Sequence, residues 1–144
     1  MKNELNGVMV FDASVIIDFL IDEKIGKYLR ERIIGEVIIP YTPETAVLEV
    51  KYVLCRLLGY DQAIAVVNNF LSSGYLLVEP INDLIDIASK YKRYRAISLP
   101  DALVLSLANR VNVPALFARR EKEIISEMKK KPFNVQILFL EDFV

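Results

Sequence analysis

Short apolar runs alternate with longer amphipathic segments along the whole chain. The apolar runs predict strands at residues 8–11, 37–39, 75–78, 114–117 and 135–140. The segments between them predict helices at about residues 14–20, 24–34, 43–58, 61–72, 82–94, 99–111 and 121–130. Strands that are joined through helices run parallel, and a parallel sheet needs cover on both faces. The sequence therefore predicts an α/β three-layer sandwich with a central, mainly parallel twisted sheet covered by helices on both faces.

Residues with capping preferences mark the ends of several predicted helices. Gly35, Gly59 and Gly74 follow three of them, where a glycine ends a helix at little steric cost. Thr42 and Pro43 open the long helix before Gly59, and they predict a hydroxyl at the N-cap and a proline at the first helical position. No Pro/Gly/Ser-rich linker or internal repeat interrupts this order, so we expect one domain at residues 1–144.

The composition narrows the class of protein. A chain of 144 residues can bury about 68–70% of the surface that it exposes when unfolded, so its core needs no staple. Cys55 is the only cysteine, and the chain opens without a signal-like segment, which favours the cytoplasm. No apolar run approaches the ~18 residues of a membrane span, although 53% of the residues are hydrophobic. We interpret this hydrophobic excess as surface for an oligomer or a partner.

The chain contains no histidine, and this absence excludes more chemistry than any other count. Ser-His-Asp and Cys-His catalysis, a paired-histidine ribonuclease mechanism and a histidine-ligated zinc ion are all ruled out. A net charge of −1 argues against a protein that coats nucleic acid through bulk charge. Hydrolysis would have to depend on carboxylates, lysines, hydroxyls and a bound cation.

Three acidic residues occur in settings that suit a metal site. Asp12 follows the first apolar run, Glu49 lies at the edge of the apolar face of the long helix, and Asp101 opens the helix at 99–111. Ligands of parallel sheets bind outside the carboxyl ends of the strands, which is where Asp12 lies. Hard cations such as Mg²⁺ take oxygen ligands, and clustered carboxylates need a cation or a proton between them. The pattern points to metal-assisted phosphodiester chemistry.

Each acid also has a simpler structural interpretation. Either Asp12 or Ser14 could cap the helix that follows. Asp101 follows a serine by three residues before an apolar run, which resembles a capping box. Glu49 could be a solvated side chain near Arg56. Capping does not preclude metal binding, so both interpretations remain open.

The sequence resembles the PIN-domain ribonucleases, particularly the VapC-type toxins of prokaryotic toxin–antitoxin pairs. Three motifs carry the resemblance in the family's order: VFDAS at residues 10–14, Glu49 followed by Val53 and Arg56, and SLPDALVLSLA at residues 98–108. The resemblance covers nearly the whole chain and implies a PIN-like form of the predicted fold. It implies that Asp12, Glu49 and Asp101 bind one or two Mg²⁺ or Mn²⁺ ions, which activate water for attack on an RNA phosphodiester. Ser14 would be a hydrogen-bonding partner at the site.

The fourth acid of the family is the place where this chain departs from the pattern. The family usually has a Thr-x-Asp-like segment after the fourth strand, whereas this chain has FARREKE at residues 117–123. An arginine stands where the aspartate would align, and Glu121 is the nearest substitute. Either Glu121 reaches the metal through its longer side chain, or the second cation site is weak or absent.

A basic segment with two tyrosines, KYKRYR at residues 90–95, precedes the third motif. Its cations could hold RNA phosphates while a tyrosine stacks on a base. The alternative is a solvated helix end whose cations favour the C-terminal dipole. Lysines at residues 129–131 are most simply a charged turn before a proline. The candidates for contact with RNA are Lys92, Arg93, Arg95, Arg119 and Arg120.

The leading interpretation is a Mg²⁺- or Mn²⁺-dependent endoribonuclease that acts as a toxin. The resemblance implies an RNA substrate, an antitoxin partner and a homodimer, for which the apolar stripe at residues 63–71 is a candidate surface, although core packing is its simpler use. The main alternative is a catalytically impaired PIN-like module that binds RNA or protein. A Mg²⁺-binding receiver domain fits worse, because Asp12-Ala13 and Glu79-Pro80 stand where it needs paired acids and a phosphoacceptor aspartate.

Overall fold

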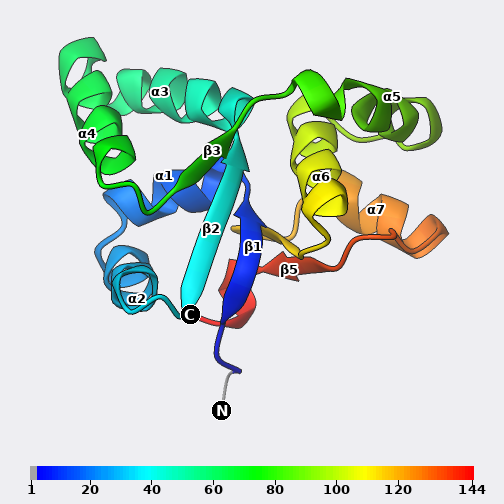
Figure 1. Cartoon of the computed structure of the whole chain (residues 1–144), viewed down its shortest axis with the longest axis horizontal. Helices are drawn as coiled ribbons and strands as arrows, with labels where there is room; N and C mark the ends of the chain where they lie inside the picture. Colours follow the sequence, from blue (N-terminus) through cyan, green and yellow to red (C-terminus); the bar gives the residue numbers. More distant parts are fainter. Residues whose placement is uncertain (1–2) are drawn as a thin grey trace.

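The computed structural model, which describes residues 3–144, is built around a five-stranded parallel sheet. In chain order the strands are β1 (Gly7–Phe11), β2 (Ile38–Pro43), β3 (Leu77–Glu79), β4 (Ala115–Phe117) and β5 (Ile137–Phe139). Their order across the sheet is β3-β2-β1-β4-β5, and every neighbouring pair is parallel (Figure 1). β1 therefore lies at the centre of the sheet, and its carboxyl end meets those of β2 and β4.

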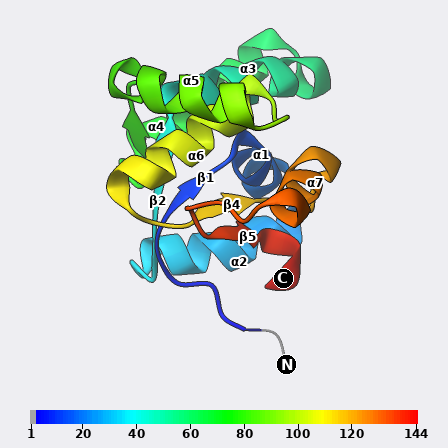
Figure 2. The same cartoon turned by 90° about the vertical axis from the view of Figure 1, so that its right-hand side faces the viewer.

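Helices connect the strands and cover both faces of the sheet. They are α1 (Ala13–Ile21), α2 (Glu23–Ile34), α3 (Glu44–Leu58), α4 (Tyr60–Ser72), α5 (Ile85–Tyr94), α6 (Leu99–Val111) and α7 (Lys122–Lys130). Short 3₁₀ turns lie at Asn82–Leu84 and Leu140–Asp142. Side chains of α1 to α4 pack in one core cluster and those of α5 to α7 in another, and α3 and α5 share one end of the molecule (Figures 1 and 2). The predicted α/β sandwich with a parallel central sheet is confirmed.

β1 is buried on both faces, and this burial explains its unbroken apolar sequence. Met9 and Phe11 pack in the cluster with α1 to α4, whereas Val10 packs with α5 to α7, and all three side chains are fully buried. A strand that is covered on both sides has no solvent face on which polar residues could alternate. The run ends at Asp12, so the first polar side chain after β1 emerges at the centre of the carboxyl edge of the sheet.

Thr42 does not cap the long helix, and the prediction from its sequence is wrong. β2 pairs with β3 as far as Pro43, so Thr42 is held in the sheet, and Pro43 takes the N-cap position of α3 without a side-chain hydrogen bond. The Thr42 hydroxyl instead donates to the backbone oxygen of Phe11 at 2.8 Å. This bond joins the ends of β1 and β2 next to Asp12.

The remaining boundaries differ from the prediction by a few residues. β3 begins at Leu77 rather than at residue 75, and β5 occupies only the middle of the predicted strand at 135–140. The predicted helix at 82–94 begins as the 3₁₀ turn. Apolar runs locate strands, but pairing with neighbours decides where each strand ends. Within residues 3–144, no helix combines the length and the apolar character that crossing a membrane requires.

The Thr42→Val substitution should lower the free energy of unfolding by about 1–2 kcal/mol, because it removes a buried hydrogen bond while keeping the shape of the side chain. Urea unfolding followed by circular dichroism measures this change. Thr45→Val is the matched control, since the Thr45 hydroxyl is buried without a hydrogen-bond partner and its loss should be neutral or stabilising. Equal destabilisation by the two substitutions would show that the Thr42 hydroxyl contributes nothing specific.

Candidate metal centre

Asp12 is almost fully buried at the end of β1. Its side chain is 4% exposed and caps α1, accepting from the Ser14 backbone N–H at 3.0 Å and from the Ser14 hydroxyl at 2.6 Å. The capping interpretation is thus correct for Asp12, with Ser14 as its donor. Desolvation by burial raises the pKa of Asp12, and the hydrogen bonds from Ser14 and Ala13 offset this only in part. A desolvated carboxylate of this kind gains from a nearby cation.

Asp101 lies in the first turn of α6 and is 6% exposed. Its backbone N–H donates to the Ser98 hydroxyl at 3.2 Å, so Ser98 is the N-cap residue, as the capping-box interpretation predicts. Desolvation and then the charge of Asp12 raise the pKa of Asp101 to about 6, against smaller lowering effects of hydrogen bonds with Glu121 and Ser98. The helix cap therefore does not neutralise Asp101, and Asp12 is the nearby charge that acts most strongly on its carboxylate.

Glu49 is half-buried on α3 and faces the same acids. Desolvation raises its pKa first, and the charges of Asp12 and Asp101 raise it further. Its alternative partner Arg56 lies instead over the ring of Tyr52, with 5.4 Å from the guanidinium carbon to the ring centroid. No ion pair joins Glu49 to Arg56 among the residues that the structure describes. The charge of Glu49 therefore interacts with the charges of Asp12 and Asp101 and is not neutralised by Arg56.

Glu121 immediately precedes α7 and completes a set of four acids. It makes a side-chain hydrogen bond with Asp101, and its pKa rises to about 8 through desolvation first and then through the charges of Asp101 and Asp12. A pKa of about 8 favours the protonated Glu121 carboxyl at neutral pH, which can donate to the Asp101 carboxylate. Glu121 therefore lies beside Asp101, and the pair shares a proton when no cation is present.

The four acids come from four different elements at the carboxyl edge of the sheet. β1, α3, α6 and the start of α7 supply Asp12, Glu49, Asp101 and Glu121 respectively. Within residues 3–144, no three acidic side chains are grouped tightly enough to hold one ion as they stand. Glu49 and Glu121 are only half-buried, whereas Asp12 and Asp101 are almost fully buried. The donors are all carboxylates, which fits Mg²⁺ or Mn²⁺ in chemistry and in charge.

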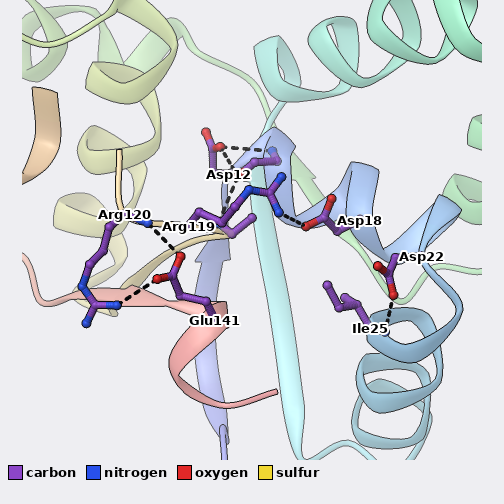
Figure 3. A network of polar contacts seen from close by, with 9 residues as sticks. Asp12, Asp18, Asp22, Ile25, Arg119, Arg120 and Glu141 are labelled. Atoms are coloured by element: carbon purple, nitrogen blue, oxygen red, sulfur yellow. Dashed lines mark hydrogen bonds and ion pairs between the residues drawn. The ribbon is translucent and has the colours of Figure 1, made fainter. Parts of the chain in front are cut away.

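The loop after β4 is fixed on both sides through Arg119 and Arg120 (Figure 3). It leads to Glu121 at the start of α7. On one side the Ala118 N–H donates to the Ser14 hydroxyl at 3.1 Å, and Arg119 pairs with Asp18 of α1 at 2.9 Å. On the other side Arg120 donates through its backbone N–H to Glu141 at 3.1 Å. Its guanidinium also pairs with Glu141 and with Asp142, at 3.1 and 2.7 Å. Both arginines that were predicted to contact RNA therefore hold this loop in place.

Sequence reasoning missed the acids that anchor this loop. Asp18 is 8% exposed within α1, and Glu141 and Asp142 lie in the C-terminal 3₁₀ turn. Their partners are about 20 to 100 residues away in the sequence, so no local pattern points to them. Thr45 was also missed as a site neighbour. It lies one helical turn before Glu49, a spacing that could have identified it, and its buried hydroxyl lacks a partner.

The predicted RNA contacts of the basic segment are partly engaged within the protein. The Lys92 ammonium donates to the Ile97 carbonyl at 2.7 Å. Arg95 donates to three backbone carbonyls and lies over the ring of Phe133 at 4.0 Å. Arg93 lies over Tyr94 at 5.2 Å and has no acidic partner among the described residues. Contact of these cations with RNA stays a prediction.

Comparison with known proteins identifies the family to which this chain belongs. The sequence matches the PIN domain over residues 9–128, a range that includes all four acids. The chain therefore belongs to the PIN domain family. No curated protein matches the sequence.

Solved structures with similar folds include VapC-type toxins and their complexes. VapBC2 from Rickettsia felis, bound to a DNA fragment from the promoter, matches with a TM-score of 0.66 at 14% identity, covering 91% of this chain and 97% of that chain. VapC20 from Mycobacterium tuberculosis, a toxin that cleaves the sarcin-ricin loop, matches with a TM-score of 0.63 at 19% identity, covering 82% and 94%. VapBC-1 from nontypeable Haemophilus influenzae gives 0.65 at 16% identity, covering 94% and 99%. These similarities establish a VapC-like PIN fold.

The stability of the metal-free protein should fall as pH rises from about 4 to about 8. The folded pKa values of Asp101 and Glu121, about 6 and about 8, exceed the usual values near 4, so the folded state binds more protons in this interval. Glu121→Gln should remove much of this loss and stabilise the protein at pH 8.5 by about 1–2 kcal/mol, with little effect at pH 4. Thermal unfolding in EDTA at several pH values measures the pH dependence of the wild type and the effect of Glu121→Gln.

Glu23→Gln is the control for this prediction. Glu23 is exposed in the first turn of α2, so its substitution removes the same charge from the start of a helix, and its charge is not among those that raise the pKa values of Asp101 and Glu121. Stabilisation of the same size by both substitutions would show that general relief of negative charge, and not the Asp101–Glu121 pair, causes the pH dependence.

Proposed function

We propose that this PIN domain is a Mg²⁺- or Mn²⁺-dependent endoribonuclease. The observation that carries the proposal is the convergence of Asp12, Glu49, Asp101 and Glu121, all with raised pKa values. Four mutually repelling carboxylates at the carboxyl edge of the sheet are costly to the fold and are relieved by a divalent cation. Perturbed acids that gather in this way are typical of a functional site.

Asp12, Glu49 and Asp101 would hold the cation, and Glu121 would join them after losing the proton that it shares with Asp101. A cation bound there supplies a Lewis acid that lowers the pKa of water and neutralises charge on the phosphate. Ser14 fixes the rotamer of Asp12 through its 2.6 Å hydrogen bond. The chain's own contribution is thus orientation: it fixes Asp12 and Asp101 through helix caps and leaves Glu49 and Glu121 adjustable.

A catalytically impaired PIN-like module that binds RNA or protein is the second candidate. The replacement of the fourth aspartate and the absence, within residues 3–144, of a ready three-acid group favour it. The two candidates differ in their use of the carboxylates. An endoribonuclease needs them to bind metal and to cleave RNA, whereas a binding module keeps its affinity when they are neutralised.

Mn²⁺ should bind to the wild-type protein and should bind at least tenfold more weakly to Asp12→Asn and Asp101→Asn, because each variant loses a ligand and a negative charge. Isothermal titration calorimetry with folded variants measures this loss, with Glu23→Gln, an exposed acid in the first turn of α2, as the control that keeps wild-type affinity. Cleavage of structured RNA in Mn²⁺, abolished by EDTA and by Asp12→Asn, would complete the case. No Mn²⁺ binding up to millimolar concentrations would contradict the nuclease and favour the binding module.

We further propose that the protein is the toxin of a toxin–antitoxin pair and acts in the cytoplasm. The similar structures include VapBC toxin–antitoxin complexes, which support an antitoxin protein as partner. A neighbouring gene for a small DNA-binding protein that restores growth upon co-expression would support this role. Growth that is unaffected by induced expression of the wild-type chain would contradict it.

A homodimer is part of the proposal, but its surface differs from the apolar stripe at 63–71. Ala63 and Val67 of that stripe are 0% and 2% exposed, so they serve the core. Large apolar side chains are exposed instead at Leu48 and Tyr52 of α3, Ile85 of α5 and Leu99 of α6. The helices α3 and α5 share one end of the molecule (Figure 2). Such exposure fits an interface better than free solvent.

Light scattering at micromolar concentration should give twice the chain mass of 16.5 kDa. Leu48→Ser combined with Tyr52→Ser should shift the protein to the monomer, because both side chains lie on one face of α3. Leu57→Ser, an exposed leucine on the opposite face of the same helix, should leave the mass unchanged. A monomeric mass for the wild type would refute the homodimer.

A further inference from the structure

A pocket of about 410 Å³ lies between α5, α6 and the segment after α7, away from the four acids. This volume falls within the range of pockets that bind small ligands. Its walls combine cationic, aromatic and amide side chains, and none of the described residues that line it is acidic. The cationic, aromatic and amide residues that line the pocket include Lys90, Tyr91, Tyr94, Asn109, Lys131 and Asn134. This composition is unusual for a chain whose net charge is −1.

Arg95 forms the frame of the pocket. It donates to the carbonyls of Glu127, Lys131 and Pro132 at 3.0, 2.6 and 2.9 Å, which ties the end of α5 to the end of α7. Carbonyls at helix ends carry partial negative charge and repel an anion. Because Arg95 binds these carbonyls, it removes that repulsion and fixes the backbone of Lys131.

Tyr91 is fixed in the pocket by a hydrogen bond, whereas Tyr94 is exposed and has the Arg93 guanidinium carbon 5.2 Å from its ring centroid. The Tyr91 hydroxyl donates to the side-chain oxygen of Asn134 at 2.7 Å, and its ring lies 6.2 Å from that of Phe133. Tyr94 is 70% exposed at the last residue of α5. An exposed aromatic ring beside a rigid one offers a face on which a base can stack.

Two lysines of the pocket have unneutralised charges. Neither Lys90 nor Lys131 forms an ion pair with any residue in 3–144. The nearest buried acid, Glu127, pairs with Lys130 at 3.1 Å and faces Arg95 at 3.9 Å, so its charge is already balanced. The cations available to a ligand are therefore Lys90 and Lys131, and not Lys92 or Arg95 of the same basic segment.

We propose that this pocket binds one nucleotide of a single-stranded RNA segment, with its phosphate at Lys90 and Lys131 and its base against Tyr94. The Asn109 amide can donate to and accept from the edge of that base, and the Asn134 side-chain N–H groups can donate to it, since the Asn134 oxygen already accepts from Tyr91. The site would hold substrate at a distance from the reacting phosphodiester. The choice of RNA as ligand rests on the proposed function, but binding at this pocket needs neither metal nor hydrolysis.

Fluorescence anisotropy of labelled 12-nucleotide RNAs, oligo(U) and oligo(A), tests the proposal in EDTA, where no cleavage occurs. The protein variants are Lys90→Ala with Lys131→Ala, and Tyr94→Ala. The matched control is Lys24→Ala with Lys27→Ala, which removes two exposed lysines of α2 and changes the net charge equally. Thermal unfolding confirms that each variant is folded.

The pocket double variant should raise Kd at least tenfold and should reduce the slope of log K against log salt by about 1.4, as expected for two lost phosphate contacts with a single strand. Tyr94→Ala should weaken binding about tenfold without changing that slope, because stacking releases no counterions. The control double variant should change Kd less than twofold.

Equal weakening by the pocket and control double variants would overturn the proposal in favour of bulk charge. Absence of RNA binding by the wild type at 50 mM salt would overturn it as well, and so would a Tyr94→Ala variant that binds RNA as tightly as the wild type. These measurements need no cation, so a failure of the pocket proposal can be distinguished from a failure of metal binding in the Mn²⁺ titration. An inactive metal site with an intact pocket would leave an RNA-binding module.

Discussion

The burial of Asp12 at the end of the central strand is the constraint on which the site depends. β1 carries the carboxylate to the middle of the sheet edge, where it is 4% exposed, and Ser14 holds it there with two hydrogen bonds. The Asp12 charge also acts on the other three acids, because it raises the pKa of each of them. A cation that neutralises Asp12 would therefore lower the electrostatic cost of the whole cluster.

The elements that form this edge are held together by polar contacts as well as by packing. The Thr42 hydroxyl bonds to the Phe11 carbonyl, and the Ser14 hydroxyl joins Asp12 to the loop after β4. The Thr42–Phe11 and Ala118–Ser14 bonds cross from one βα unit to another, so β1, β2 and β4 end in a fixed relation. Such cross-links supply the precision that a metal-binding carboxylate would need, because packing alone leaves a loop freer to shift.

The sequence predicted the fold and the positions of two of the acids at the ends of their elements, because both follow from local patterns. Asp12 and Asp101 stand where a buried strand ends and a buried helix begins, and periodicity alone locates such places. Glu49 could be placed at a helix edge, but its coupling to Asp12 depends on how α3 packs. Thr42 was misassigned because its capping chemistry is visible in the sequence whereas the pairing of β2 with β3 is not. The roles of Arg95 and Arg119 depend on partners far along the chain, which no local pattern reveals.

An arginine at the family's fourth-acid position could in principle replace a metal ion by neutralising the carboxylates. The structure excludes this, because Arg119 is paired with Asp18 at 2.9 Å and Arg120 with Glu141 and Asp142. Their positive charges are balanced by acids outside the site. Asp12, Glu49, Asp101 and Glu121 keep their mutual repulsion, and in the absence of a cation only the proton shared by Asp101 and Glu121 relieves it. The arginines at this position therefore leave the charges of the four acids uncompensated, which is the condition under which the proposed divalent cation would bind.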